Sequence, residues 1–247
     1  MKHILSLALL ILIFASCSKE EEYGATSIHT IPFGEEGTLS EGDYSGDGAV
    51  TNVAGTTVTI EGKVTVDAFS ASGKIYVPEG ATLIVNSVMT VGGGAVLDIH
   101  GTLITQSYTQ IGNTYMTNGI LGVSGKFTVG GGTTLYLENS EVEAGEFVIV
   151  GHVKAISNDE TMAANYYSII EAIGVKYLNR GGGTTVCGPI LFTMHEDQGA
   201  SGVNMSNVTS AALGNNSAVQ SAYGLSTSTT LYQYDDTCPA LAEMPAH

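Results

Sequence analysis

The stretch 75–104, "IYVPEGATLIVNSVMTVGGGAVLDIHGTLI", decides the fold that the sequence predicts. Its apolar residues come in pairs with one residue between them, such as Ile75 and Val77, which is the alternation of a β-strand with one buried face. The gaps between pairs alternate between five and three residues, so the unit recurs every 14 residues from Ile75 to Met89 to Leu103. Short strands joined by short, repeated corners favour a β-solenoid.

Glycine triplets mark three of the predicted corners. They stand just ahead of strand-like residues in "GGGAVLDI" at 92–99, "GGGTTLYL" at 130–137 and "GGGTTVCG" at 181–188. Glycine accepts the positive φ of a sharp corner, and the threonine and valine that follow suit a strand. The 30-residue stretch at 75–104 resembles the rungs of parallel β-helices found on bacterial surface proteins.

That resemblance implies a core of stacked rungs, in which alternate residues point inward and the others face water. The inward set is made of Ile, Val, Leu, Met and Phe. The predicted outward set is Tyr76, Thr90, Asp98, Thr128 and Tyr136. An antiparallel β-sandwich is the alternative fold, because three-residue gaps also make hairpins.

The predicted organisation has four parts. A signal peptide at 1–16 precedes an acidic flexible tether at 17–52, an all-β parallel β-helix at 53–200 and an irregular C-terminal capping region at 201–247. The tether is rich in Glu, Gly and Ser, and the cap would cover the open end of the solenoid. Residues 157–175 fit either an amphipathic helix or a loop followed by strands.

The N-terminus reads as a lipoprotein signal. An apolar run of eleven residues ends at Phe14 and would rise only about 16 Å as a helix, too little to span a bilayer core of about 30 Å. The "FASC" that follows resembles the lipobox of bacterial lipoproteins, which implies cleavage before Cys17 and acylation of that residue. An ordinary signal peptide with an incidental cysteine is the alternative.

The residues after this cysteine carry a second resemblance. "CSKEEE" resembles the lipoprotein export signal of Bacteroidota, formed here by Ser18, Lys19, Glu20, Glu21 and Glu22. The resemblance implies a protein anchored by lipid in the outer membrane and facing the extracellular side. A solvated tether without a sorting role is the alternative.

Composition restricts the partners. The chain has 24 Asp and Glu against 8 Lys and Arg, a formal net charge of −16, which disfavours nucleic acid and anionic headgroups as ligands. Once Cys17 is acylated, Cys187 and Cys238 remain, and in an oxidising compartment a disulfide between them is the simplest arrangement. The sequence predicts no metal site and no cofactor, because no further cysteine or histidine lies at ligand spacing.

The candidates for chemistry are weak. Asp43, Ser45, Asp47 and Gly48 match the start of an EF-hand loop, but position twelve is Ala54 and no helices flank it, so a glycine-rich turn competes with a calcium site. A polysaccharide lyase would need a cluster of basic residues, which the sequence does not show. The remaining polar candidates are Arg180, at a predicted corner, and His195, Glu196 and Asp197, in a predicted loop.

The sequence therefore predicts a non-catalytic, lipid-anchored surface solenoid that acts as a structural or adhesive scaffold. A glycan-binding module is the first alternative, and a polysaccharide lyase or hydrolase is the second. A glycan-binding module should show a row of tyrosines along one face, whereas a plain scaffold should show only outward ladders of Ser, Thr and Asn. The expected partners are the outer membrane, through the lipid, and a glycan or surface protein.

Overall fold

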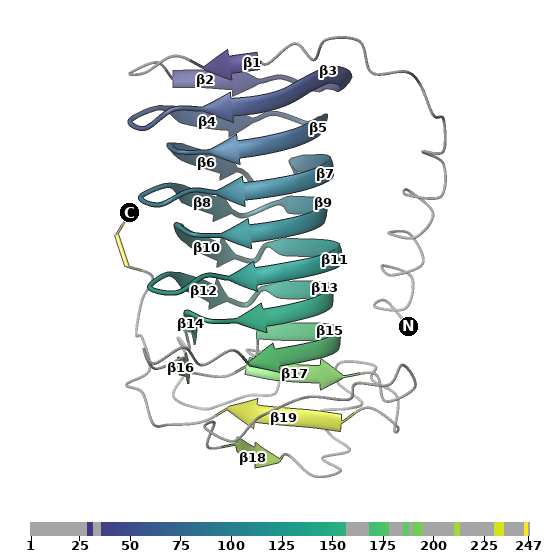
Figure 1. The fold of residues 1–247 in the computed structure, drawn as a ribbon, viewed down its shortest axis with the longest axis vertical. Coiled ribbons are helices and arrows are strands. Elements are labelled where there is room, and N and C mark those ends of the chain that lie inside the picture. Colours follow the sequence, from purple (N-terminus) through teal and green to yellow (C-terminus); the bar gives the residue numbers. More distant parts are fainter. Residues whose placement is uncertain are drawn as a thin grey trace.

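The computed structural model describes residues 29–31, 36–156, 168–177, 185–187, 190–194, 210–212, 230–234 and 245–246. This part of the chain is all-β and forms a parallel β-solenoid of about six turns (Figure 1). The strands stack along one axis, and the chain passes alternately between two sheets. Within the described ranges, no helix has the length and apolar character needed to cross a membrane.

The odd-numbered strands and β18 form sheet A, and the other even-numbered strands form sheet B. Sheet A contains, in spatial order, β1 (His29–Ile31), β3 (Gly42–Asn52), β5 (Lys63–Ala71), β7 (Thr82–Val91), β9 (Thr102–Gln110), β11 (Ile120–Val129), β13 (Glu141–Ile149), β15 (Ser168–Tyr177), β17 (Ile190–Met194), β19 (Thr230–Tyr234) and β18 (Ser210–Ala212). Sheet B contains β2 (Glu36–Leu39), β4 (Thr57–Ile60), β6 (Lys74–Val77), β8 (Val96–Ile99), β10 (Asn113–Thr117), β12 (Thr134–Glu138), β14 (His152–Ala155) and β16 (Thr185–Cys187).

Parallel pairing confirms the β-helix over the sandwich. Each described strand from β1 to β17 pairs in parallel with the equivalent strand one coil away. Antiparallel pairing is confined to β17 with β19 and β19 with β18, which end the stack. The long strands of sheet A shift register near their middle, for example between Val66 and Phe69 of β5. Because a bulge bends its strand, the coil has three sides, two from sheet A and one from sheet B.

The sequence repeat is longer than the 14-residue unit that the apolar pairs suggested. Register places Ile75 beside Leu97, 22 positions on, and Leu97 beside Thr114, 17 positions on, so long and short coils alternate. The structural repeat is therefore two coils, or 39 positions from Ile75 to Thr114. Ile75, Met89 and Leu103 lie on three different sides of the coil. A step of 14 residues therefore advances the chain by two sides and not by a whole coil.

Turns explain the alternation of coil length. Long turns follow β3, β7 and β11 and protrude on one side of the stack (Figure 1). Each has a glycine in the left-handed region at its third position, namely Gly55, Gly94 and Gly132, as a type II turn requires. The glycine-triplet prediction is thus confirmed at 92–94 and 130–132, while the triplet at 181–183 lies outside the described residues.

Short corners fit beneath these long turns. Gly112 donates its N–H to Val91 O at 3.0 Å, and a Cβ on Gly112 would lie 2.3 Å from Ala95 O and 2.5 Å from Gly92 O. Gly73 and Gly151 occupy equivalent corners with equally close carbonyl oxygens. Only a residue without a Cβ allows the backbone of one coil to nest this closely under the turn of the coil before it.

The core consists of inward columns of stacked aliphatic side chains. One column runs Val64, Leu83, Leu103, Leu121 and Val142, all with no exposed surface. A neighbouring column stacks aromatic rings, with centroids 4.7 Å apart between Tyr108 and Phe127 and 4.9 Å between Phe127 and Phe147. Burying one such side chain contributes about 1.5–3 kcal/mol, which makes the columns the main stabilising feature.

One coil carries several inward polar side chains. Thr105, Tyr108, Gln110 and Thr114 are fully buried on β9 and β10, each in a different inward column. The residues of those columns in the coils on either side are apolar: Val85, Met89, Val91, Leu97, Val123, Phe127, Val129 and Leu135. Tyr108 and Thr114 hydrogen-bond through their hydroxyl groups, and burial raises the pKa of Tyr108. We call residues 102–117 the polar coil.

The described strands begin earlier than the predicted solenoid boundary. The tether was expected to extend through residue 52, but β1, β2 and β3 already belong to the sheets. Leu39 and Val50 are buried, at 4% and 3% exposed, so the segment contributes to the core despite its glycines and acids. The sequence pattern did not reveal strand β3, because a bulge interrupts its alternation. A register shift between Tyr44 and Ala49 marks this bulge.

The C-terminal half of the prediction is resolved in part. Strand β15 covers 168–177, so residues 168–175 form a strand rather than a helix, and residues 157–167 lie outside the described chain. Strands β18 and β19 fall in the region predicted as a cap, where they replace parallel stacking by antiparallel pairs.

Candidate functional site

Most residues predicted for anchoring and cross-linking are not among those described. Cys17, the export signal at 18–22 and Cys238 lie outside the described residues. Cys187 ends strand β16, but its side chain is not described. The lipid anchor and the disulfide therefore stay predictions. The polar candidates of the C-terminal part also lie outside the described residues: Arg180, His195, Glu196 and Asp197.

The EF-hand-like residues form a bulge within β3. Asp43 accepts hydrogen bonds from the backbone N–H and the hydroxyl of Ser45, which lower the pKa of its carboxyl group. The N–H groups of Gly46 and Gly48 donate to Asp67 Oδ2 at 2.8 and 3.3 Å. This is the geometry of a glycine-rich turn. Nowhere in the described chain do three His, Cys, Asp or Glu side chains gather as a metal-binding group.

Aromatic and charged side chains gather instead on the outer side of sheet B. Parallel register aligns one outward residue from each successive strand, about 4.8 Å apart. We call this row the tyrosine column: Thr59, Tyr76, Asp98, Tyr115, Tyr136 and Lys154. The tyrosine face is the column together with the outward residues beside it: Lys74, His100, Asn113, Thr117, Glu138 and His152.

The tyrosine rings are held in fixed orientations. Tyr115 and Tyr136 stack with their centroids 4.8 Å apart and an interplanar angle of 7°. Tyr76 meets His100 edge to face at 5.5 Å. Tyr115 is 6% exposed, whereas Tyr76 and Tyr136 are partly exposed, so two accessible rings flank a buried middle. Burial and the nearby Tyr136 raise the pKa of Tyr115, so its hydroxyl stays protonated.

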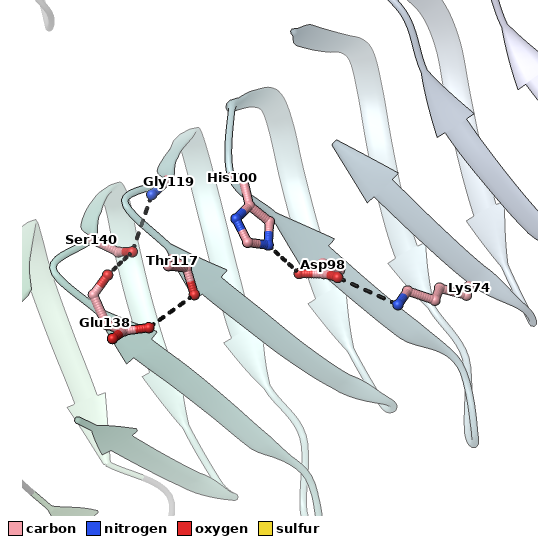
Figure 2. A network of polar contacts seen from close by, with 7 residues as sticks. All are labelled: Lys74, Asp98, His100, Thr117, Gly119, Glu138 and Ser140. Carbon is pink, nitrogen blue, oxygen red and sulfur yellow. Dashed lines mark hydrogen bonds and ion pairs between the residues drawn. The ribbon is translucent and has the colours of Figure 1, made fainter. Parts of the chain in front are cut away.

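A charged network centred on Asp98 lies beside the tyrosine rings, and Figure 2 shows its members. Asp98 Oδ2 pairs with Lys74 Nζ at 3.4 Å, and Asp98 Oδ1 contacts His100 Nε2 at 3.1 Å. Asp98 points outward as predicted, but it is only 6% exposed because large neighbouring side chains cover it. The expectation that Asp98 stands on a plain wet face is therefore wrong. The carboxylate fixes the positions of one lysine and one histidine.

A second network holds the corner at one border of the face (Figure 2). Thr117 Oγ1 donates to Glu138 Oε2 at 3.2 Å. The Ser140 hydroxyl donates to the backbone oxygen of Glu138 at 2.8 Å and accepts the N–H of Gly119 at 3.2 Å. The bonds of Thr117 and Gly119 join consecutive coils, so the polar groups beside Tyr136 are ordered before any ligand arrives.

Sheet A presents a different outer surface. One of its outward columns is a ladder of hydroxyl side chains: Thr51, Ser70, Thr90, Thr109 and Thr128. We call it the hydroxyl ladder. It has the plain character expected of a scaffold surface, whereas the tyrosine face has the aromatic row expected of a glycan-binding surface. Both features thus occur on one solenoid, on different sheets.

Sequence reasoning found part of this site. It placed Tyr76 and Tyr136 outward but did not include Tyr115, because the 14-residue unit fails in the short coil that contains it. A repeat of two coils would have aligned "KIYV" at 74–77 with "NTYM" at 113–116 and revealed Tyr115 as an outward residue. Comparisons with protein-family models, with curated proteins and with solved structures find no match for this chain, so its function rests on its own residues.

Proposed function

We propose that the protein is a lipid-anchored module of the outer cell surface that binds glycans through the tyrosine face and has no catalytic role. The observation that carries the proposal is the in-register tyrosine column. Tyrosine combines an apolar ring with a hydrogen-bonding hydroxyl, which suits sugars, whose rings have apolar C–H faces and polar edges.

The spacing of the accessible rings supports an extended ligand. Tyr76 on β6 and Tyr136 on β12 are three coils apart, or about 14 Å. Hydrogen-bonding groups lie beside the rings, among them Lys74, His100 and Glu138. An oligosaccharide lying along the solenoid axis would contact both rings. Because the side chains are already ordered by stacking and ion pairing, little conformational entropy is lost on binding.

The anchor is part of the proposal and has its own test. Mass spectrometry of the protein purified from its native membrane should find a mature chain that begins at Cys17 and carries acyl chains. Several acyl chains bind a bilayer stably, at about 0.8 kcal/mol per buried methylene. A Cys17→Ser variant should keep its signal peptide and lose the lipid. An unmodified mature chain that begins elsewhere would contradict the anchor.

Surface exposure is a separate prediction, based on the acidic run. A protease that cannot cross the membrane should degrade the protein on intact cells. Replacing Glu20, Glu21 and Glu22 together by alanine should protect it, because the protein then stays on the inner side. Unchanged degradation of the variant would show that the acidic run has no sorting role and is only part of a tether.

Binding is tested by affinity electrophoresis through gels that contain dextran, xylan or polygalacturonate. At least one polymer should retard the protein. Tyr136→Ala and Tyr76→Ala should each reduce the retardation, since each removes an accessible ring. Thr90→Ala, on the hydroxyl ladder of sheet A, is the matched control and should migrate like the unmodified protein.

Circular dichroism and urea unfolding establish that the tyrosine variants remain folded. Loss of binding in folded variants supports the tyrosine face as the binding surface. If neither tyrosine variant changes the retardation, or if none of the three polymers is bound, the proposal is wrong and the plain scaffold becomes the better interpretation.

A further inference from the structure

Charge is distributed unevenly around the solenoid. On the outer side of sheet A, the described side chains include four acids and two lysines: Asp43, Asp67, Glu141, Glu146, Lys63 and Lys126. On the tyrosine face, two lysines and two histidines accompany two acids: Lys74, Lys154, His100, His152, Asp98 and Glu138. In a chain of net charge −16, the described part of the tyrosine face is thus less acidic than the described outer side of sheet A taken as a whole.

The two acids of this face are already engaged. Asp98 contacts both Lys74 and His100, so it offsets the charge of that lysine. Glu138 accepts a hydrogen bond from Thr117. Neither carboxylate pairs with Lys154, which lies on β14 at the far end of the tyrosine column from Tyr76.

Lys154 has no ion pair or hydrogen bond within the described residues, and it is partly buried. Its register neighbours are Tyr136 on β12 and Cys187 on β16, and His152 lies two residues away on the same side of β14. None of these is acidic, and Glu138 is only a diagonal neighbour. Among the described residues, the Lys154 ammonium is therefore a positive charge without an acidic partner, directly beside the accessible ring of Tyr136.

We propose that Lys154, together with Tyr136, forms a subsite for the carboxylate of an acidic sugar, so that the preferred glycan contains uronic acid residues. This inference rests on the proposed function and gives the class of its ligand. The sugar ring would pack on Tyr136 while its carboxylate pairs with the Lys154 ammonium.

The net negative charge of the chain does not prevent this pairing. Exposed charges more than a Debye length apart, about 8 Å at physiological ionic strength, are largely screened. The acids of sheet A lie on other sides of the coil, whereas Lys154 meets the ligand directly. The electrostatic contribution is therefore local, and it should weaken as salt is added.

The test compares two forms of one polymer: polygalacturonate and the same polymer with its carboxylates reduced to neutral hydroxymethyl groups. The protein should bind the acidic form about fivefold more tightly, the effect of one well-placed surface ion pair. Lys154→Gln should abolish this preference and leave affinity for the neutral form unchanged. Lys126→Gln, on sheet A near Glu146, is the matched control and should keep the preference.

The outcomes separate the inference from the proposed function. Equal binding of both polymers, or a preference that survives Lys154→Gln, would overturn the carboxylate subsite while leaving a neutral-glycan site in place. Binding of neither polymer by the unmodified protein would overturn the subsite, and retention of some other polysaccharide would then preserve the proposed function alone.

Discussion

Gly112→Ala should unfold the solenoid at much lower urea concentration than the unmodified protein needs. The added Cβ would lie 2.3 Å from Ala95 O and 2.5 Å from Gly92 O, and both atoms belong to the backbone of the preceding coil. No rotamer can relieve a backbone contact, so the two coils must separate locally and weaken the hydrogen bonds between them. Overpacking typically costs about 1–3 kcal/mol, and the cost here should lie at the upper end because backbone atoms are opposed.

Gly93→Ala is the matched control, because it makes the same chemical change in the turn that covers Gly112. A Cβ on Gly93 meets no atom within 4 Å, and its φ is not in the left-handed region. This variant should be neutral or more stable by about 0.4–1 kcal/mol, since alanine restricts the unfolded chain. Unfolding followed by circular dichroism measures both. Equal midpoints for the two variants would contradict the nesting of short corners under long turns.

Leu97→Asp should prevent folding altogether. Leu97 has no exposed surface and lies between Ile75 and Thr114 in an inward column of sheet B. An aspartate there buries a carboxylate without a charged partner, at a cost of several kcal/mol, against a total stability of about 5–15 kcal/mol for a typical domain. The expected observation is loss of the β-sheet circular dichroism signal or loss of soluble protein.

Two further variants, at outward positions, provide the stabilities with which Leu97→Asp is compared. Thr90→Asp places the same side chain on the hydroxyl ladder, which is partly exposed, and should cost less than about 1 kcal/mol. Asp98→Leu should be intermediate, at about 1–2 kcal/mol, because it removes the contacts with Lys74 and His100 but leaves both partners partly solvated. Similar stability of the Leu97 and Thr90 variants would refute the assignment of inward and outward sides.

The sequence was sufficient for the fold class because alternation and corner chemistry are local. Pairs such as Leu97 and Ile99 reveal which side of a strand is buried, and a glycine such as Gly94 reveals a turn. The number of residues in each coil, in contrast, is not determined by local sequence. It depends on whether a short corner fits under the turn of the previous coil, and that contact joins residues such as Gly112 and Ala95 that only stacking brings together.

The candidate site was less predictable for the same reason. Tyr76, Tyr115 and Tyr136 share a column only through register, and no spacing of 14 residues connects them. The contacts of Asp98 with His100 in the following turn and with Lys74 on a neighbouring strand were equally hidden. An outward direction can be read from alternation, whereas exposure depends on the size of the neighbours in the adjacent coils.

The polar coil breaks a symmetry that would otherwise make the stack ambiguous. Sliding one part of the stack past another by two coils would return long turns and short corners to equivalent positions, so the corners alone do not forbid such a slip. Gln110 Nε2, however, donates to Thr133 Oγ1 in the next coil at 3.5 Å, and both side chains are buried. Two coils before Thr133, the equivalent turn position is Ala95, which offers no hydroxyl group. After such a slip the Gln110 amide would face aliphatic side chains, at about 1–3 kcal/mol for the lost partner. This contact between coils therefore favours a single alignment of an almost repetitive chain.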